Sequence, residues 1–223
     1  MGTVIFDLDG TLADTGGDLV AAANVCFAQM GEGAVLDVST DAITAMQKGG
    51  RAMLALGFER LGRKADIDRW YPVLLEAYAA DIAHHTRFYD GTLEAVEALR
   101  SAGYRTGICT NKPAALAEQL MQEMGARGLF HSLVGADTLP VRKPDPAPLR
   151  EAVARAGGVM ERALLVGDTP TDRETARAAG VPSLLVTFGP AGRDVAALHP
   201  EAMIDHYREL SGVVEGLIGA PVA

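Results

Sequence analysis

Residues 3–15 of the chain read TVIFDLDGTLADT. The first four are β-branched or aromatic, and the run ends abruptly at Asp7, Asp9 and Gly10. A short apolar run that is closed by acidic residues and a glycine predicts a buried parallel strand that enters a loop. In an open α/β sheet, ligands bind beyond the carboxyl ends of the strands, so we expect this loop to carry chemistry.

The next part of the chain has a different pattern, which is helical throughout. Apolar residues recur at helical spacing, the breaks contain glycine, and no convincing strand interrupts the pattern. The predicted helices are Leu19–Met30, Ala42–Leu61 and Ile67–Ile82. We therefore predict an all-helical domain over residues 16–85, inserted into a core that residues 1–15 and 86–223 form.

After Tyr89, strand and helix patterns alternate. The predicted strands are Tyr104–Cys109, Ser132–Gly135, Ala163–Gly167 and Ser183–Thr187. The predicted helices are Thr92–Ser101, Pro113–Met124, Pro146–Ala156 and Thr171–Ala179, the last with Thr171 and Glu174 as a capping box. Such alternation predicts an α/β fold, with a Rossmann-like parallel sheet core and helices on both faces, and the insertion adds an α-helical cap domain.

The composition limits the partners and the compartment that we expect. The 223 residues carry a formal charge of −9, which is the wrong sign for a protein that follows a nucleic-acid backbone. No stretch approaches the roughly 18 apolar residues of a membrane-spanning helix, and Cys26 and Cys109 form neither a disulfide framework nor a metal-binding pattern. We expect a cytoplasmic protein without nucleic-acid or membrane partners, either a monomer or a homodimer.

Polar side chains follow four of the predicted strands. These are Asp7 and Asp9 after the first strand, Thr110 and Asn111 after the second, Lys143 beyond the third, and Asp168 after the fourth. Because parallel strands end at the same edge of a sheet, we expect these residues to converge. Each one alone is typical of a turn or a helix entry, whereas their shared position and matching chemistry favour a site.

The carboxylates Asp7, Asp9 and Asp168 would be costly to gather in one place without a cation. Hard oxygen ligands without His or Cys nearby favour Mg²⁺, which keeps several waters and often shares its shell with a phosphate. Magnesium would also screen the repulsion that a carboxylate meets when it attacks a phosphate dianion. The candidate chemistry is therefore phosphoryl transfer from a small phosphorylated metabolite by a covalent route.

Thr110 and Asn111 lie between a predicted strand and a helix that begins at Pro113. Backbone N–H groups and the helix dipole would form an anion site there, and the Thr110 hydroxyl would donate to a phosphate oxygen. Lys143 precedes Pro144, so its backbone is expected to be extended, and its ammonium would act as a point charge for the phosphoryl group. We assign Thr110, Asn111 and Lys143 to substrate binding, with Thr110 and Lys143 also catalytic.

These residues closely resemble the motifs of the haloacid dehalogenase superfamily. Residues 7–15 (DLDGTLADT) resemble its first motif, residues 110–112 (TNK) the second, residues 143–146 (KPDP) the third, and residues 167–172 (GDTPTD) the fourth. The resemblance spans nearly the whole chain, and the helical insertion matches the cap that the superfamily places between its first and second motifs. Within the superfamily, the wording TNKP and KPDPAPL is most similar to that of phosphoglycolate phosphatases.

The resemblance implies a role for each acidic residue. Asp7 would be the nucleophile that becomes phosphorylated, and Asp9 would be the general acid for the leaving alcohol and then the base that activates water. The Asp9 backbone carbonyl would also touch the metal. Asp168 would be a metal ligand and Asp172 would lie in or beside the metal shell, so the implied Mg²⁺ set is Asp7, Asp9, Asp168 and Asp172. For Asp172, an ordinary charge in the first turn of a helix is the alternative.

The predicted cap departs from the family pattern in one place. Residues 46–51 read MQKGGR where phosphoglycolate phosphatases often carry Val-Gly-x-Gly. Lys48 and Arg51 would close over a carboxylate or phosphate of the substrate, or they are solvated helix residues. The links near residues 14–17 and 84–89 are expected to act as hinges that open for the substrate and close against water.

Three functions remain open at this point. The first is a Mg²⁺-dependent phosphatase that hydrolyses a small phosphomonoester, with 2-phosphoglycolate the first guess, through an aspartyl-phosphate intermediate. The second is a phosphomutase, which uses the same aspartate pair and returns the phosphoryl group to a bound sugar. The third is a non-catalytic binding protein that keeps the fold, although it predicts the loss of some of the polar groups that this chain retains.

Overall fold

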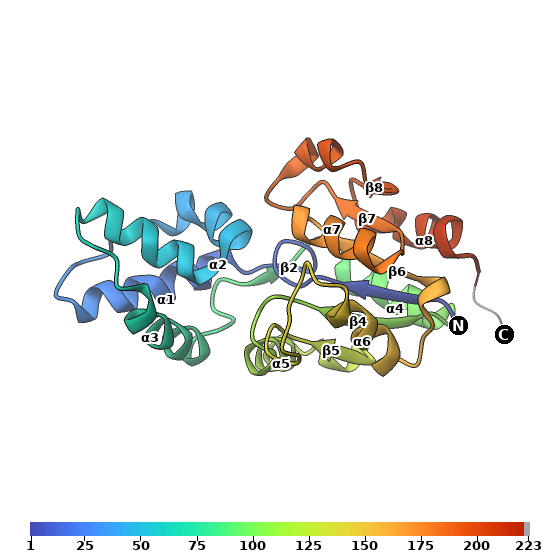
Figure 1. The fold of residues 1–223 in the computed structure, drawn as a ribbon, viewed down its shortest axis with the longest axis horizontal. Coiled ribbons are helices and arrows are strands. Elements are labelled where there is room, and N and C mark those ends of the chain that lie inside the picture. The colour runs from blue at the N-terminus through green and yellow to red at the C-terminus, as the bar shows by residue number, and fades with distance from the viewer. Residues whose placement is uncertain (221–223) are drawn as a thin grey trace. The chain divides into compact units, whose positions relative to one another are not determined.

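The computed structural model describes residues 1–220, and the chain divides into two compact units (Figure 1). One unit comprises Met1–Ala13 and Phe88–Ala223, and the other comprises Asp14–Arg87. The chain passes between them through β2 (Ala13–Asp14) and β3 (Arg87–Phe88), which form a two-stranded sheet. The helical unit is thus two residues longer at each end than the sequence predicts, because such short strands leave no alternating pattern to detect.

The α/β unit is built on a six-stranded sheet in the order β5-β4-β1-β6-β7-β8. Its strands are β1 (Thr3–Phe6), β4 (Arg105–Cys109), β5 (Ser132–Val134), β6 (Ala163–Gly167), β7 (Ser183–Val186) and β8 (Ala202–Ile204). All neighbouring strands are parallel, and Phe6 pairs with Ile108 on one side and Val166 on the other. The residues that follow β1, β4 and β6 therefore leave the sheet at one edge.

Helices cover the sheet. They are α4 (Thr92–Ser101), α5 (Ala114–Glu123), α6 (Ala147–Arg155), α7 (Pro170–Ala179) and α8 (Leu210–Ile218), with short helices η1 (Arg127–Leu129), η2 (Met160–Arg162), η3 (Gly192–Leu198) and η4 (Tyr207–Glu209). Helices α6 and α7 pack against each other and the sheet, and α4 and α8 form a second such pair. The crossover from β1 to β4 through α4 and the crossover from β5 to β6 through α6 run in opposite directions along the sheet. Right-handed crossovers therefore place α4 and α6 on opposite faces, and α8 packs beside α4. The predicted Rossmann-like fold is confirmed.

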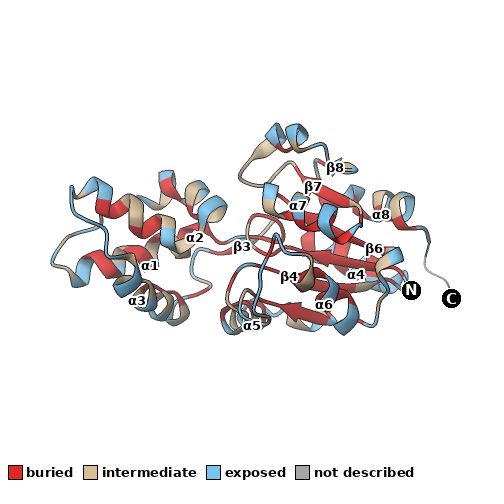
Figure 2. Ribbon diagram, in the orientation of Figure 1, coloured by how far each residue is buried: buried red, intermediate tan, exposed pale blue. Residues whose placement is uncertain are grey.

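The central strands are buried on both sides: β1 and β6 are buried along their length and β4 from Thr106 to Cys109, and Figure 2 draws buried residues in red. On the α6–α7 side, Ile5 and Leu165 of the sheet pack with Leu149 and Val153 of α6 and Ala176 of α7. Burial on both faces explains why these strands read as continuous apolar runs in the sequence rather than as alternating ones. The packing also holds the loops at their carboxyl ends in fixed positions.

The second unit is a bundle of three helices, α1 (Gly16–Gln29), α2 (Val38–Arg60) and α3 (Ile67–Ala80), which pack on one another. Phe27 of α1 meets Phe58 of α2 edge to face, with ring centroids 5.8 Å apart. Gly57 allows this approach, since a Cβ there would lie 2.1 Å from the Phe27 ring. Helix α2 is kinked at Gly49, whose φ of 74° favours glycine.

The start of α7 differs from the prediction. The N-cap is Thr169, not Thr171, and the capping box joins Thr169 to Asp172 rather than Thr171 to Glu174. Pro170 occupies the first turn, where its fixed φ and missing N–H cost nothing, so the helix begins earlier than the apolar spacing suggests. Residues 188–218, for which the sequence predicts no elements, form short helices, β8 and α8. Among residues 1–220, no helix is both long and apolar enough to cross a bilayer.

Candidate active site

Three buried carboxylates meet at the carboxyl edge of the sheet. Asp7 follows β1, Asp168 follows β6, and Asp172 lies in the first turn of α7; one oxygen of each lies within 4.8 Å of the others. Their exposed fractions are 8%, 2% and 0%. A set of carboxylate oxygens without His or Cys suits a hard cation such as Mg²⁺. The residues present thus fit the metal that the sequence predicts.

Lys143 contacts two members of this cluster. Its Nζ lies 3.0 Å from Asp7 Oδ1 and 2.6 Å from Asp172 Oδ1, and its side chain is 1% exposed. Burial alone would lower the pKa of Lys143, but the carboxylates of Asp172 and Asp7 raise it above its ordinary value. The lysine is therefore charged, and it lies beside the residue that is predicted to receive the phosphoryl group.

The carboxyl groups bear an excess of negative charge that one ammonium does not balance. Burial raises the pKa of Asp7 to about 7; Lys143 opposes the shift, and the carboxylates of Asp172 and Asp9 add to it. Burial also raises the pKa of Asp168 well above its usual range, and Asp172 and Asp7 add to that shift. A divalent cation in this place would favour the ionised forms, so the cluster is electrostatically incomplete without one.

Asp168 is held by residues that the sequence analysis missed. The Thr11 hydroxyl donates to Asp168 Oδ1 at 2.7 Å, and the buried Tyr207 hydroxyl donates to the Thr11 carbonyl at 2.8 Å. Gly10 has a φ of 79°, and a Cβ there would lie 2.5 Å from Asp168 Oδ2. Gly10 and Thr11 belong to the motif that opens the chain and could have been found, whereas nothing in the sequence around Tyr207 indicates its role.

The turn at Phe188-Gly189-Pro190 lies against the same loop. A Cβ on Gly189 would lie 2.6 Å from the Gly10 carbonyl oxygen and 3.0 Å from Asp168 Cβ. The turn therefore needs glycine in order to pack on the first motif and on Asp168. Its position after β7, at the same edge of the sheet, is the signal in the sequence that points to it.

Asp172 takes part both in the capping box of α7 and in the carboxylate cluster. Its Oδ2 accepts the Thr169 N–H at 3.1 Å as part of the capping box, and its Oδ1 accepts a hydrogen bond from Lys143. It also belongs to the carboxylate cluster with Asp7 and Asp168. The capping contact fixes the side chain so that it faces the cluster.

The loop after β4 is tightly bonded to its surroundings. Thr110 is 3% exposed, and its Oγ1 accepts the Lys112 N–H at 3.1 Å. The Asn111 side-chain amide donates to the Lys143 carbonyl at 3.1 Å and so ties this loop to the third motif. The Ala114 N–H, at the start of α5, donates to Asp137 Oδ1 at 2.7 Å. It is therefore not directed at an anion, although the sequence predicts this for the N–H groups of this turn. The Thr110 side chain thus lies at the edge as predicted, while Asn111 joins two loops.

Asp9 stands apart from the carboxylate cluster. Its Oδ1 lies 2.8 Å from Lys112 Nζ, and the two side chains are 23% and 7% exposed. Lys112 belongs to the second motif, and the sequence indicates no function for it. Pairing between side chains that are 103 positions apart cannot be read from spacing, although a lysine directly after the polar end of β4 is a hint.

The two candidate residues of the helical unit lie on α2. Lys48 is exposed and directly precedes the kink at Gly49. Arg51 is also exposed, pairs with Asp68 at 2.8 Å, and has its guanidinium 4.4 Å from the centre of the Tyr71 ring. Arg51 is thus held by partners within its own unit.

The haloacid dehalogenase-like hydrolase family matches the chain over residues 4–186. The phosphoglycolate phosphatase of Mesorhizobium japonicum is 38% identical over 211 residues, which cover 93% of this chain and 92% of the relative. That of Rhodospirillum rubrum is 39% identical over 226 residues, covering 93% and 88%. The crystal structure of a predicted phosphoglycolate phosphatase from Haemophilus somnus superposes with a TM-score of 0.83 at 22% identity, covering 96% of this chain and 97% of the other.

The chain belongs to the haloacid dehalogenase-like hydrolase family. Within that family it is similar to phosphoglycolate phosphatases along nearly its whole length. The predicted family and the predicted resemblance to these hydrolases are confirmed.

Proposed function

We propose that this protein is a Mg²⁺-dependent phosphatase that hydrolyses a small phosphomonoester, with 2-phosphoglycolate as the first candidate substrate. The observation that carries the proposal is the buried cluster of Asp7, Asp168 and Asp172 against the charged Lys143. Such a cluster is unstable as a purely structural feature, because it keeps carboxylates close together in a dry place. The names of the relatives support the choice of substrate.

Each residue of the site has its own role in the proposed reaction. An Asp7 carboxylate oxygen forms a bond to phosphorus while the bond from phosphorus to the ester oxygen breaks, and Asp9 gives its proton to the departing alkoxide. Asp9 then takes a proton from water, whose oxygen attacks the phosphorus and releases inorganic phosphate and free Asp7. Lys143 and the Thr110 hydroxyl neutralise and orient the phosphoryl oxygens. Bound Mg²⁺ on Asp7, Asp168, Asp172 and the Asp9 carbonyl would supply further charge neutralisation.

The helical unit completes the proposal as a cap. Residues 14–17 and 84–89 would serve as its hinges, and Lys48 and Arg51 would contact the substrate on closure. Solution scattering with Mg²⁺ and a phosphate mimic should then report a more compact particle than scattering without them. An unchanged radius of gyration would contradict the closure.

The alternatives keep the same fold and much of the same site. A phosphomutase would return the phosphoryl group from Asp7 to a bound sugar, and likeness of fold does not separate it from a phosphatase. A non-catalytic binding protein is disfavoured, because the nucleophile, the acid–base residue, Thr110, Lys143 and Asp168 are all retained.

The test is phosphate release from a panel of small phosphomonoesters, with and without Mg²⁺. Wild type is compared with Asp7→Asn and with Asp194→Asn, a matched change at an exposed position on η3. We expect Mg²⁺-dependent release by wild type and Asp194→Asn, and a loss on the order of 10⁴-fold in Asp7→Asn. Release that survives in Asp7→Asn would refute the nucleophile, and release that needs an added bisphosphate would favour the mutase.

A further inference from the structure

Lys112 occupies a buried position at the catalytic edge, and the proposed mechanism gives it no task. It follows β4 by three residues, and its side chain is 7% exposed. Its backbone is fixed on both sides, since its N–H donates to Thr110 Oγ1 at 3.1 Å and its carbonyl accepts the Ala136 N–H at 3.0 Å. With its backbone fixed, its side chain buried and its Nζ paired with Asp9 at 2.8 Å, the ammonium is held in place before any ligand arrives, which reduces the entropy cost of binding an anion there.

The two lysines of the site have different partners. Lys143 contacts Asp7 and Asp172, whereas Lys112 contacts Asp9 at 2.8 Å. In the proposed reaction Asp7 bonds to phosphorus and Asp9 protonates the ester oxygen that departs. Lys143 thus belongs to the phosphoryl side of the site, and Lys112 belongs to the side of the leaving group.

The distances limit what Lys112 can reach. A general acid works at roughly 2.6–3.2 Å from the atom that it protonates. Lys112 Nζ lies 2.8 Å from Asp9 Oδ1, so the ammonium adjoins the residue that would protonate the leaving oxygen. A carboxylate on the carbon that bears that oxygen would therefore lie beside Asp9 and near Lys112, and a buried ammonium discriminates strongly between such a carboxylate and a neutral group.

We propose that Lys112 is a specificity-determining residue that binds a carboxylate on the leaving group of the substrate. The inference rests on the proposed phosphatase function and deepens it by naming a substrate class, phosphomonoesters of 2-hydroxy acids. The substrate carboxylate replaces Asp9 as the partner of Lys112. Asp9 is then released toward the leaving oxygen. Binding of a substrate carboxylate to Lys112 therefore also places the acid–base residue for the reaction. A substrate with a neutral tail leaves the pair between Lys112 and Asp9 in place.

A binding experiment tests the assignment without turnover. The probes are 3-phosphonopropionate, in which a methylene replaces the ester oxygen of 2-phosphoglycolate, and its carboxamide, each titrated calorimetrically in the presence of Mg²⁺. Wild type should bind the carboxylate more tightly than the amide by about 10- to 100-fold, the range expected for a hydrogen bond to a charged group. In Lys112→Met this ratio should fall toward one, and Lys112→Arg should keep part of it.

Turnover provides a second readout. For 2-phosphoglycolate and phosphorylated glycolamide, the ratio of their kcat/KM values should be similarly large in wild type and should collapse in Lys112→Met, with the larger change in KM for the acid. Comparing the two substrates within one variant cancels any general effect of the mutation on folding. Lys64→Met is the matched control, because Lys64 is exposed in the loop between α2 and α3.

The outcomes separate the two proposals. A wild-type preference for the carboxylate that Lys112→Met abolishes and Lys64→Met retains establishes the assignment, even if neither ester is hydrolysed, in which case the proposed phosphatase function fails alone. A preference that persists in Lys112→Met, or no preference in wild type, overturns the assignment while leaving the phosphatase intact. If Lys112→Met does not fold, as judged by circular dichroism, Lys112→Gln takes its place with the same expectations.

Discussion

The two units of the molecule bury carboxylates in opposite ways. In the helical unit, Asp18 is 2% exposed and accepts hydrogen bonds from the His85 N–H at 2.7 Å and from the Thr86 N–H and hydroxyl at 2.8 and 2.6 Å. Asp41 is 4% exposed and receives both terminal nitrogens of Arg60, each at 2.7 Å. Each of these carboxylates has several donors of its own, as a group that stabilises a fold requires.

In the α/β unit, three buried carboxylates lie together and two of them share Lys143. The pKa values of the two kinds of carboxylate shift in opposite directions. The hydrogen bond from Arg60 lowers the pKa of Asp41, whereas burial raises the pKa of Asp7 to about 7. The comparison teaches that a buried acid is not itself a sign of function. The sign is a buried acid whose surroundings favour its neutral form, in a place where a ligand of opposite charge would reverse that preference.

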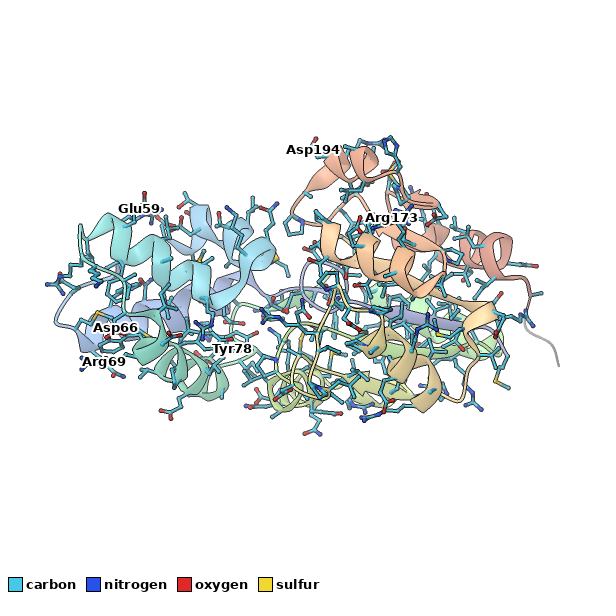
Figure 3. The ribbon with its side chains drawn as sticks, viewed as in Figure 1. Glu59, Asp66, Arg69, Tyr78, Arg173 and Asp194 are labelled. Carbon is cyan, nitrogen blue, oxygen red and sulfur yellow. The ribbon has the colours of Figure 1, made fainter. Side chains whose placement is uncertain are left out.

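Other charges of the helical unit remain at its surface. Figure 3 labels Glu59, Asp66 and Arg69 on the outside of the bundle, and all three are exposed. Tyr78, labelled in the same view, is 1% exposed and packs inside. The charges of this unit therefore follow the ordinary rule that ions face water, which makes the exception in the other unit more informative.

The comparison predicts that removing one acid from each unit has opposite consequences. Asp168→Asn should reduce Mg²⁺-dependent turnover by roughly 100-fold or more, because a metal ligand is lost. Its metal-free form should melt no lower than wild type, since one of three crowded charges is gone. Asp41→Asn should keep the dependence of turnover on Mg²⁺ and should lower the stability of the helical unit. An Asp168→Asn protein with normal metal-dependent turnover would remove Asp168 from the site.

Magnesium should stabilise the protein at high pH more than at low pH. Asp7 has a raised pKa of about 7 in the folded chain, so its contribution to stability falls as pH rises from about 4 through 7, and bound metal offsets that loss. At a concentration about 100 times its dissociation constant, Mg²⁺ should add roughly 2.7 kcal/mol to the free energy of unfolding. Thermal melting at pH 5 and pH 8, each with Mg²⁺ or EDTA, measures the effect; equal shifts at both values would contradict it.

The sequence predicts some parts of this molecule to the residue. The bounds of β1, α4 and β6 agree with the prediction, because a dense apolar run or a clear helical spacing ends at a glycine or an acidic residue in each case. The meeting of Asp7 and Asp168 at one edge of the sheet follows from a general rule about parallel sheets. These features depend on local pattern and on topology, both of which a sequence carries.

Other parts depend on contacts between distant residues. The pairs Thr11–Asp168 and Asp9–Lys112, and the Tyr207 hydroxyl on the Thr11 carbonyl, join segments that no spacing relates. The sequence also predicts neither β8 nor the helices η3 and η4, since β8 has three residues and short 3₁₀ helices lack a helical period. Arg173 of α7, labelled in Figure 3, ties that segment down by donating to the Leu198 carbonyl and pairing with Glu201.

Asp18 offers a test of the structural kind of buried acid. Asp18→Ala should cost about 2 kcal/mol of stability, because the N–H groups of His85 and Thr86 lose their acceptor. The single tryptophan, Trp70, lies in α3, so its fluorescence during urea unfolding reports on the helical unit. Asp66→Ala is the matched control, since Asp66 is exposed and makes no capping hydrogen bond, and should change stability by at most about 0.5 kcal/mol. Equal effects of the two substitutions would mean that Asp18 does not tie the ends of the bundle.

The smallest expected effect is the response of the helical unit to acid. The hydrogen bond from Arg60 lowers the pKa of Asp41 below its ordinary value of 3.8. A lowered pKa in the folded state stabilises the fold above the unfolded pKa, and this contribution is lost as pH falls through the folded value. The Trp70 signal should therefore show a decline in stability below about pH 4, and Asp41→Asn should flatten that decline. The stability of the metal-free α/β unit should instead fall as the pH rises above about 4, because the folded site favours the protonated forms of Asp7 and Asp168. If both units weakened together and only below pH 4, the contrast between the two kinds of buried carboxylate would be lost.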